Sequence, residues 1–178
     1  CMIRIYTDGA AQGNPGPGGF GVVMKFTDAV KELSGGFRLT TTNRMELLAV
    51  ITGLEAIKKD GIGVTIYSDS KYVVDAVEKG WIWAWQKKNF AKKANPDLWQ
   101  RYIQLHQKYR PKFVWVKGHA GHPENERCDQ LAVEDGRGLI GRNISARLGR
   151  RAAKDVVGAE GAKAGQSGLV RALDPHRF

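Results

Sequence analysis

Apolar and polar positions alternate along the first residues of the chain. In residues 2–8, Ile3 and Ile5 flank Arg4, and this two-residue period is typical of a half-buried strand. Four further apolar segments, bounded by glycine or polar residues, have the length of strands. The sequence therefore predicts strands at residues 2–8, 20–26, 31–39, 64–69 and 112–117.

A helical period replaces this alternation in TTTNRMELLAVITGLEAIKK, where Met45, Leu48 and Ile51 form an apolar stripe that we expect to end before Gly61. The glycine-rich run GNPGPGGFG is expected to be a loop between the first two strands. Further helices are predicted near residues 71–79 and 97–109 and from residue 123 onward, on either side of a Trp- and Lys-rich segment that reaches residue 95.

The predicted order of elements is therefore β-β-β-α-β-α-α-β-α. Strands that follow one another directly form antiparallel hairpins, whereas strands reached through helices pair in parallel through crossovers. The expected fold class is α/β with a mixed sheet.

Composition divides the 178-residue chain in two. Apolar residues make up 42% and charged residues 26%, as in ordinary globular domains. The 28 Lys and Arg exceed the 18 Asp and Glu, and the net charge of +10 favours a polyanionic partner. Residues 136–178 hold nine basic, three acidic and eight glycine residues. We expect a folded domain at residues 1–135 and a weakly ordered basic tail at 136–178.

Two other classes of protein are not expected. No apolar run reaches the roughly 18 residues of a membrane span, and the first ten residues have no signal-peptide core. Cys1 and Cys128 are too far apart in the chain to indicate a disulfide framework or a zinc finger. A reducing, cytoplasmic location without a membrane partner is the expectation.

Acidic residues mark the ends of two predicted strands, at Asp8 in IYTDG and Asp69 in IYSDS. Open α/β sheets bind ligands outside the carboxyl ends of adjacent strands, so these carboxylates converge if the two strands are neighbours. Glu46 lies near the start of the long helix, and Asp129 lies on the last helix, four residues after Asn125.

Each acid also has a purely structural explanation. Asp69 is placed to cap the following helix, and Glu46 follows Asn43 at capping-box spacing. Asp129 on its own is simply a solvated helix residue. Together, however, four carboxylates in one cleft would repel one another unless cations neutralised them. An all-oxygen set favours Mg²⁺ or Mn²⁺ over zinc.

The blocks that carry these acids resemble ribonuclease H of the bacterial type I family. They are YTDGAAQGNPGPGGFG, TTTNRMELLA, YSDSKYV, DLWQRY and WVKGHAGHPENERCDQLA, in that order, within residues 2–135. The resemblance implies a five-stranded sheet in order 3-2-1-4-5 with flanking helices. It also implies cleavage of the RNA strand of RNA–DNA hybrids to 5′-phosphate and 3′-hydroxyl ends, using divalent metal.

The family's acidic tetrad corresponds to Asp8, Glu46, Asp69 and Asp129, and its mobile histidine to His119. Phosphodiester hydrolysis with two Mg²⁺ ions, or Mn²⁺ in their place, activates water at one ion and stabilises the leaving oxygen at the other. We expect Asp8 to bridge the ions, Glu46 and Asp69 to serve the leaving-group ion, and Asp129 to serve the other with Asp8. His119 is expected to transfer a proton or aid product release, unless it is an unused loop residue.

Substrate contacts also follow from the resemblance. The family reads the 2′-hydroxyls of RNA in the minor groove, and the matching residues are Gly9, Asn14 and Asn43. Thr41 with Asn14 matches the pocket for a DNA phosphate. The glycine-rich loop lacks the Lys-Ser/Thr ending of a P-loop, so no nucleotide or other small-molecule cofactor is expected.

Three features depart from the family pattern. Thr42 stands where an asparagine is common, and Lys71 replaces the usual glutamine, exchanging directed hydrogen bonds for a point charge. The basic protrusion within WIWAWQKKNFAKKANPDLW is short. Its candidate substrate contacts are Trp81, Trp85, Lys87 and Lys88, although tryptophans at this helical spacing also suit a packed core.

Two other functions remain open at this stage. The same fold serves transposases, integrases and junction nucleases that cut DNA, and the acidic cluster alone does not separate them from an RNA–DNA hybrid nuclease. A binding module that has lost catalysis is the second, although all four acids are present. The expected assembly state is a monomer.

Overall fold

The computed structural model describes residues 2–118, 122–140 and 171–172. Its strands are β1 (Met2–Ala11), β2 (Gly16–Phe26), β3 (Ala29–Thr40), β4 (Gly63–Ser68), β5 (Lys112–Trp115) and β6 (Arg171–Ala172). Its helices are α1 (Thr42–Glu55), α2 (Lys71–Glu78), α3 (Trp81–Lys87), α4 (Pro96–Tyr109) and α5 (Pro123–Ile140).

The strands form one mixed sheet in the order β5-β4-β1-β2-β3-β6. The hairpins β1–β2 and β2–β3 are antiparallel, and β4 pairs in parallel with both β1 and β5. The predicted order 3-2-1-4-5 is therefore confirmed for the five long strands. The two-residue strand β6 adds to the free edge of β3, at Leu33 and Ser34, and is too short to leave a hydrophobic period in the sequence.

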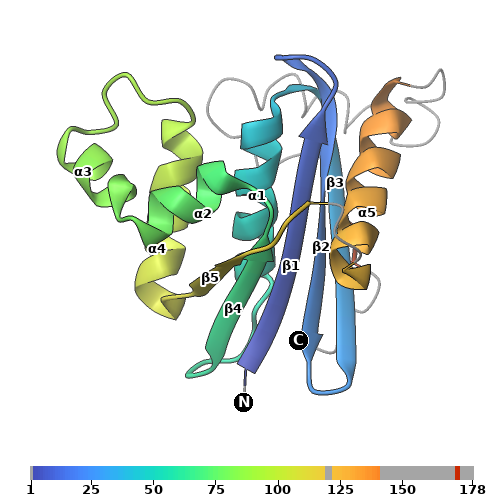
Figure 1. Ribbon diagram of the computed structural model, residues 1–178, viewed down its shortest axis with the longest axis horizontal. Coiled ribbons are helices and arrows are strands. Elements are labelled where there is room, and N and C mark those ends of the chain that lie inside the picture. The colour runs from blue at the N-terminus through green and yellow to red at the C-terminus, as the bar shows by residue number, and fades with distance from the viewer. Residues whose placement is uncertain (1, 119–121, 141–170, 173–178) are drawn as a thin grey trace.

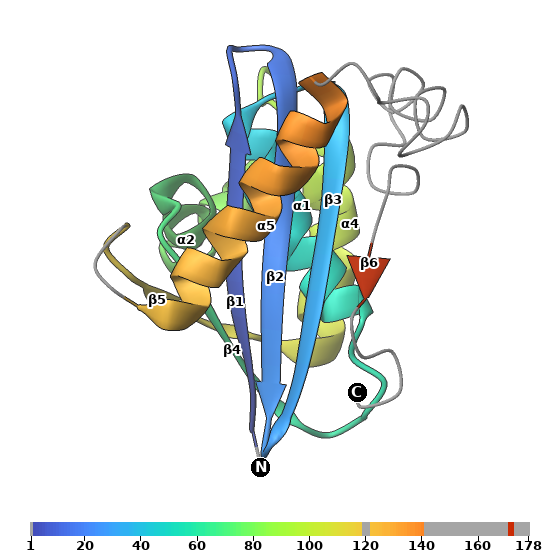
Figure 2. The ribbon, with the colours of Figure 1, turned by 90° about the vertical axis from the view of Figure 1, so that its right-hand side faces the viewer.

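Helices cover both faces of the sheet (Figures 1 and 2). Helix α5 crosses one face over β1, β2 and β3, and α1 lies on the other face with α4 behind it. Because α1 is enclosed between the sheet and α4, its residues from Met45 to Leu54 are buried except for Thr52. The larger core thus fills the α1 side, and a smaller one of Tyr6, Val23, Cys128 and Leu131 lies under α5.

Two sequence-based predictions of local structure were wrong. Strand β2 begins at Gly16, inside the run expected to be a loop, because its glycines serve close packing as well as turning. A β carbon on Gly21 would lie 2.2 Å from the carbonyl oxygen of Cys128, so glycine allows α5 to approach the sheet. Helix α3 was missing from the predicted elements although Trp81 and Trp85 have helical spacing, because its seven residues are too few for an apolar period to repeat.

The predicted domain boundary at residue 135 lies within α5, which continues to Ile140. Most of the predicted tail lies outside the described residues, so the tail and the boundary at 135 stay predictions. Among the helices described, none is both long and apolar enough to cross a bilayer.

Candidate metal centre

Parallel pairing brings Asp8 and Asp69 side by side. The last parallel pair of β1 and β4 joins Thr7 to Ser68, so each aspartate is the next residue on its own strand. The expectation that Asp8 ends its strand was wrong. Strand β1 continues to Ala11 because it remains paired with β2. Asp69 does follow the last residue of β4 directly. The two carboxylates therefore leave the sheet at the same level.

Glu46 reaches the aspartates from α1. The residue after Asp8 is Gly9, and a β carbon there would lie 2.5 Å from the main-chain nitrogen of Glu46. Only a glycine lets the first turn and a half of α1 pack this closely against β1. As a result Glu46 is buried, at 6% exposure, although it is a charged residue near the start of a helix.

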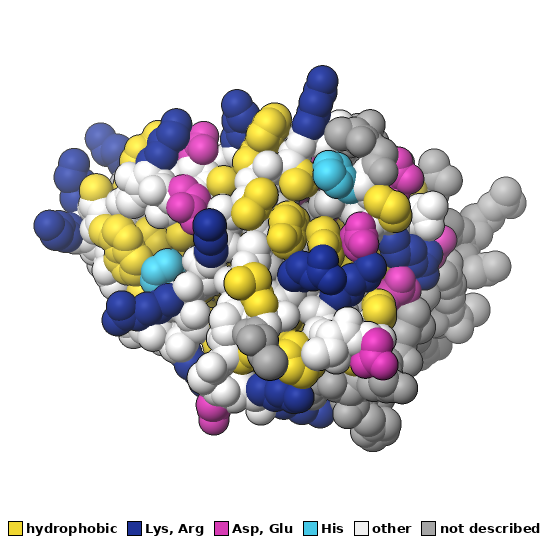
Figure 3. Space-filling model, turned by 60° about the horizontal axis from the view of Figure 1, so that its bottom comes forward, with side chains coloured by type: hydrophobic (Ala, Val, Ile, Leu, Met, Phe, Trp, Pro, Cys, Tyr) yellow, Lys and Arg dark blue, Asp and Glu magenta, His cyan; other side chains and the backbone are white. Residues whose placement is uncertain are grey.

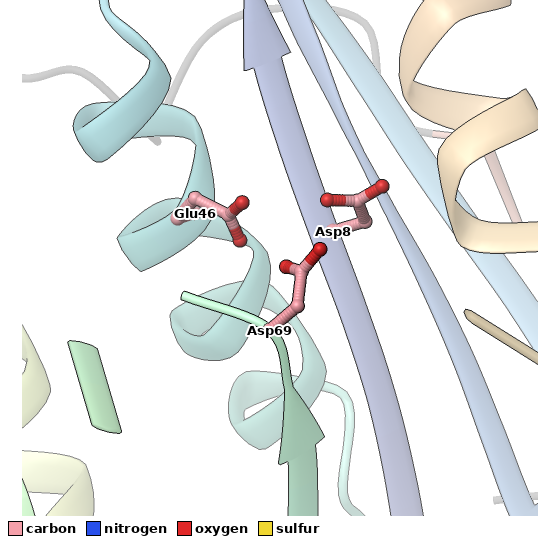
Figure 4. Close-up of side chains that lie close together, drawn as sticks. All are labelled: Asp8, Glu46 and Asp69. Carbon is pink, nitrogen blue, oxygen red and sulfur yellow. The ribbon is translucent and has the colours of Figure 1, made fainter. Parts of the chain in front are cut away.

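The three carboxylates face one another (Figure 4). Asp8, Glu46 and Asp69 each offer an oxygen, and these oxygens all lie within 4.8 Å of one another. Separations of this size suit acidic groups that share a cation. The predicted convergence of these three acids is present in the structure.

The structural explanations for Glu46 and Asp69 do not hold. The cap of α1 is Thr41, whose hydroxyl accepts a hydrogen bond from the Arg44 amide at 3.1 Å, so Asn43 and Glu46 form no capping box. The cap of α2 is Ser70, whose hydroxyl accepts from the Val73 amide at 3.3 Å. Neither helix start therefore uses the acid.

Burial and mutual repulsion disfavour the ionised carboxylates. Burial, then the charges of Asp69 and Asp129, raise the pKa of Asp8 to about 8. Burial, then the charges of Asp8 and Asp69, raise the pKa of Glu46 well above its usual range. The Oε2 atom of Glu46 is buried and accepts no hydrogen bond from the described residues. An oxygen-only site with this excess of negative charge fits a hard divalent cation.

Asp129 approaches the cluster from α5. Its charge and a hydrogen bond between the two carboxyl groups both raise the pKa of Asp8. Helix α5 is anchored by paired hydrogen bonds, each 2.9 Å, from the Arg127 guanidinium to the Glu32 carboxylate on β3. Within the described part of the chain, the group whose oxygens lie within 4.8 Å of one another does not include Asp129. Its place among the metal ligands stays a prediction.

His119 lies outside the described residues, so its predicted role stays a prediction. The chain leading to it does border the site. A β carbon on Gly118 would lie 2.8 Å from Oδ2 of Asp69. The segment after β5 therefore packs against the metal centre.

Several of the predicted substrate contacts adjoin the acids along the chain. Gly9 follows Asp8, Asn43 lies exposed one turn before Glu46, and Lys71 begins α2 two residues after Asp69. Two further predicted contacts lie elsewhere: Thr41 caps α1, and Asn14 is exposed in the turn between β1 and β2.

The predicted basic protrusion begins with helix α3 and continues through the turn that leads to α4, at the far left of Figure 1. Trp81 is 45% exposed, and the Lys79 ammonium lies 5.2 Å from its ring centre. Trp85 instead packs against the core and meets Trp99 edge to face. Lys87 and Lys88 are exposed. Trp81 is therefore a surface residue and Trp85 packs against the core. The roles of these two tryptophans and of Lys87 and Lys88 as substrate contacts stay predictions.

Sequence reasoning missed Trp115 and Gly118. The indole nitrogen of Trp115 donates a hydrogen bond to the main-chain oxygen of Asp69 at 3.2 Å. The signal available was weak, since a tryptophan between two valines in a predicted strand is most simply a packing residue.

Known proteins resemble the chain over this region. The RNase H family model matches residues 2–136. Ribonuclease H of Desulforamulus reducens is 58% identical over 136 residues, which is 74% of this chain and 85% of that protein. Ribonuclease H of Syntrophus aciditrophicus is 57% identical over 138 residues, or 75% of this chain and 79% of that one.

Solved structures with a similar fold are also ribonucleases H. LC9-RNase H1, described as a type 1 RNase H with the type 2 active-site motif, has a TM-score of 0.69 and 31% identity, over 78% of this chain and 73% of its own. LC11-RNase H1, solved in complex with an RNA/DNA hybrid, has a TM-score of 0.62 and 26% identity, over 78% and 99%. The predicted resemblance is confirmed. The chain belongs to the ribonuclease H family, whose members are metal-dependent hydrolases of nucleic acids.

Proposed function

We propose that this protein is an endoribonuclease that hydrolyses the RNA strand of RNA–DNA hybrids, leaving 5′-phosphate and 3′-hydroxyl ends. The observation that carries the proposal is the meeting of carboxylate oxygens of Asp8, Glu46 and Asp69 within 4.8 Å of one another, on the two adjacent inner strands β1 and β4 and helix α1 of a ribonuclease H fold. LC11-RNase H1, which shares the fold, was solved with an RNA/DNA hybrid.

In this proposal Asp8, Glu46, Asp69 and Asp129 hold two Mg²⁺ ions, with Mn²⁺ as a substitute. When bound, such ions lower the pKa of a water and stabilise the leaving 3′-oxygen. Asp8 lies on β1, between β4 and β2 in the sheet, and would be the ligand shared by the two ions. The burial of Glu46 excludes water from one side of the site, and β1 and β4 hold the two aspartates at one level. His119 remains the candidate for proton transfer or product release.

The hybrid is selected by residues around the acids. Asn43 and Gly9 are proposed to face the minor groove, and Lys71 a phosphate. The net positive charge of the chain assists binding, but the face in Figure 3 shows no basic patch that would locate the site. On the face in Figure 3, Lys and Arg side chains are dispersed among hydrophobic and acidic ones. The substrate position is therefore inferred from the acids.

Cleavage of three end-labelled duplexes tests this function. We expect Mg²⁺-dependent cutting of the RNA strand in RNA–DNA, and little or no cutting of DNA–DNA or RNA–RNA. EDTA abolishes the activity, and so does Asp8→Asn. Preferred cutting of DNA–DNA would place the chain with the DNA-cutting enzymes of this fold, and tight hybrid binding without cleavage would indicate a binding module.

We further propose that the protein is a monomer, that it acts in the cytoplasm and that it uses no small-molecule cofactor. Light scattering coupled to size-exclusion chromatography tests the assembly state, and a mass near 19.7 kDa is expected.

A further inference from the structure

Residues 115–118, at and just after the end of β5, lie against the chain around Asp69 at three points. The Trp115 indole N–H donates to the main-chain oxygen of Asp69 at 3.2 Å, and the Val116 amide donates to the main-chain oxygen of Ser68 at 2.9 Å. Gly118 leaves room for the Asp69 carboxylate, since a β carbon there would approach Oδ2 to 2.8 Å. Two successive carbonyls thus accept hydrogen bonds from one four-residue segment, which also packs against the Asp69 carboxylate.

Trp115 also contacts the first residue of α2. The Lys71 ammonium lies 5.0 Å from the centre of the Trp115 ring, which is a cation–π distance. Trp115 is nevertheless 45% exposed, so burial of its ring in the core does not account for its place. The indole instead connects a metal-binding aspartate with a proposed phosphate contact.

Asp69 lies directly after the last residue of β4, and the next residue, Ser70, caps α2. The Trp115 bond therefore acts on the main chain where the strand passes into the helix. Hydrogen bonds that orient a ligand commonly affect metal affinity nearly as strongly as the ligand itself.

We propose that Trp115 is a positioning residue with two separable roles. Its N–H orients Asp69 for divalent metal, and its ring places Lys71 toward the substrate. The inference rests on the proposed metal-dependent cleavage. Metal binding and substrate affinity should therefore respond to different substitutions of the same side chain.

The test uses the full chain and three variants. Trp115→Phe keeps an aromatic ring but removes the N–H, and Trp115→Leu removes both. The matched control is Tyr109→Phe, which deletes a 3.2 Å hydrogen bond to the main-chain oxygen of Ile57, away from the acids. Mn²⁺ affinity is measured by calorimetry on metal-free protein, and kcat and KM are measured with an RNA–DNA hybrid. Thermal melts establish that each variant is folded.

For Trp115→Phe we expect Mn²⁺ affinity to fall about 3- to 10-fold, the effect of one hydrogen bond. Its kcat at subsaturating Mg²⁺ falls by a similar factor, whereas KM for the hybrid is unchanged. Trp115→Leu adds an increase in KM of about 2- to 5-fold. Tyr109→Phe changes none of these.

The inference is overturned if Trp115→Phe binds Mn²⁺ and turns over as Tyr109→Phe does. An effect of both Trp115 variants on KM alone also overturns it, because Trp115 would then be a direct substrate contact. If the unaltered protein does not cleave hybrid but Trp115→Phe still weakens Mn²⁺ binding, the proposed function fails and the metal-positioning role stands. Should Trp115→Leu not fold, the calorimetry of Trp115→Phe decides.

Discussion

A β carbon on Gly9 would lie 2.5 Å from the main-chain nitrogen of Glu46. This close approach of β1 and α1 places the buried Glu46 carboxylate beside Asp8 and Asp69. The candidate metal centre therefore depends on a residue with no side chain as much as on its acids.

Gly9→Ala is expected to displace α1 from β1, because the added methyl group would overlap backbone atoms of α1 that cannot move independently of the helix. We predict a loss of about 1 to 3 kcal/mol in the free energy of unfolding and a fall of about 10- to 100-fold in kcat. Urea denaturation and hybrid cleavage below the melting range measure the two effects. The control is Gly61→Ala, which strains a residue at φ +66° with open space around it and should lower stability but not activity.

Asp8→Asn is expected to stabilise the metal-free protein at neutral and higher pH. The unfolded chain releases the Asp8 proton near pH 3.8 but the native state near pH 8, so the free energy of unfolding falls as pH rises through this window. Removing the charge should add about 1 to 3 kcal/mol at pH 8 and little at pH 4. Denaturation in EDTA across this pH range measures it, with the exposed Asp60→Asn as control. An equal gain at both pH values would contradict the assigned cause.

Divalent metal should stabilise the native state by relieving repulsion among the acids. We predict that Mg²⁺ or Mn²⁺ at about 100 times its Kd adds about 2.7 kcal/mol, which raises Tm by several degrees. This stabilisation by metal should be smaller in Glu46→Gln, because glutamine has nearly the size of glutamate but carries no charge. Calorimetric melts with and without EDTA measure it. An undiminished shift in Glu46→Gln would place the ion elsewhere.

The pattern of strands and acids predicted the convergence of Asp8 and Asp69 on the condition that their strands were neighbours, and the strand order implied by the family resemblance supplied that condition. The sequence did not predict that Thr41 rather than Asn43 caps α1, since both residue types suit that position. Nor did it predict the bond from Trp115 to Asp69, which depends on where two distant segments meet. Gly16–Gly21 was misread because a glycine needed for close packing looks identical, in sequence, to one needed for a turn.

Lys71 should bind a phosphate as a point charge. We predict that Lys71→Gln lowers the slope of log affinity for hybrid against log salt concentration by about 0.7 to 0.9, the release of one counterion. Fluorescence anisotropy in Ca²⁺ over a range of salt concentrations measures it. Lys59→Gln is the control, because the ammonium of the exposed Lys59 lies over the ring of Phe26, the last residue of β2. Equal slopes for both variants would remove Lys71 from the phosphate contacts.

Anomalous diffraction from Mn²⁺ tests the central claim most directly. Crystals of the Asp129→Asn variant with an RNA–DNA hybrid keep the three acids that lie within 4.8 Å of one another. We predict Mn²⁺ peaks in contact with the carboxylates of Asp8, Glu46 and Asp69 and with a phosphate of the RNA strand. Peaks away from all three acids, or the DNA strand's phosphate at the acids, would contradict the account.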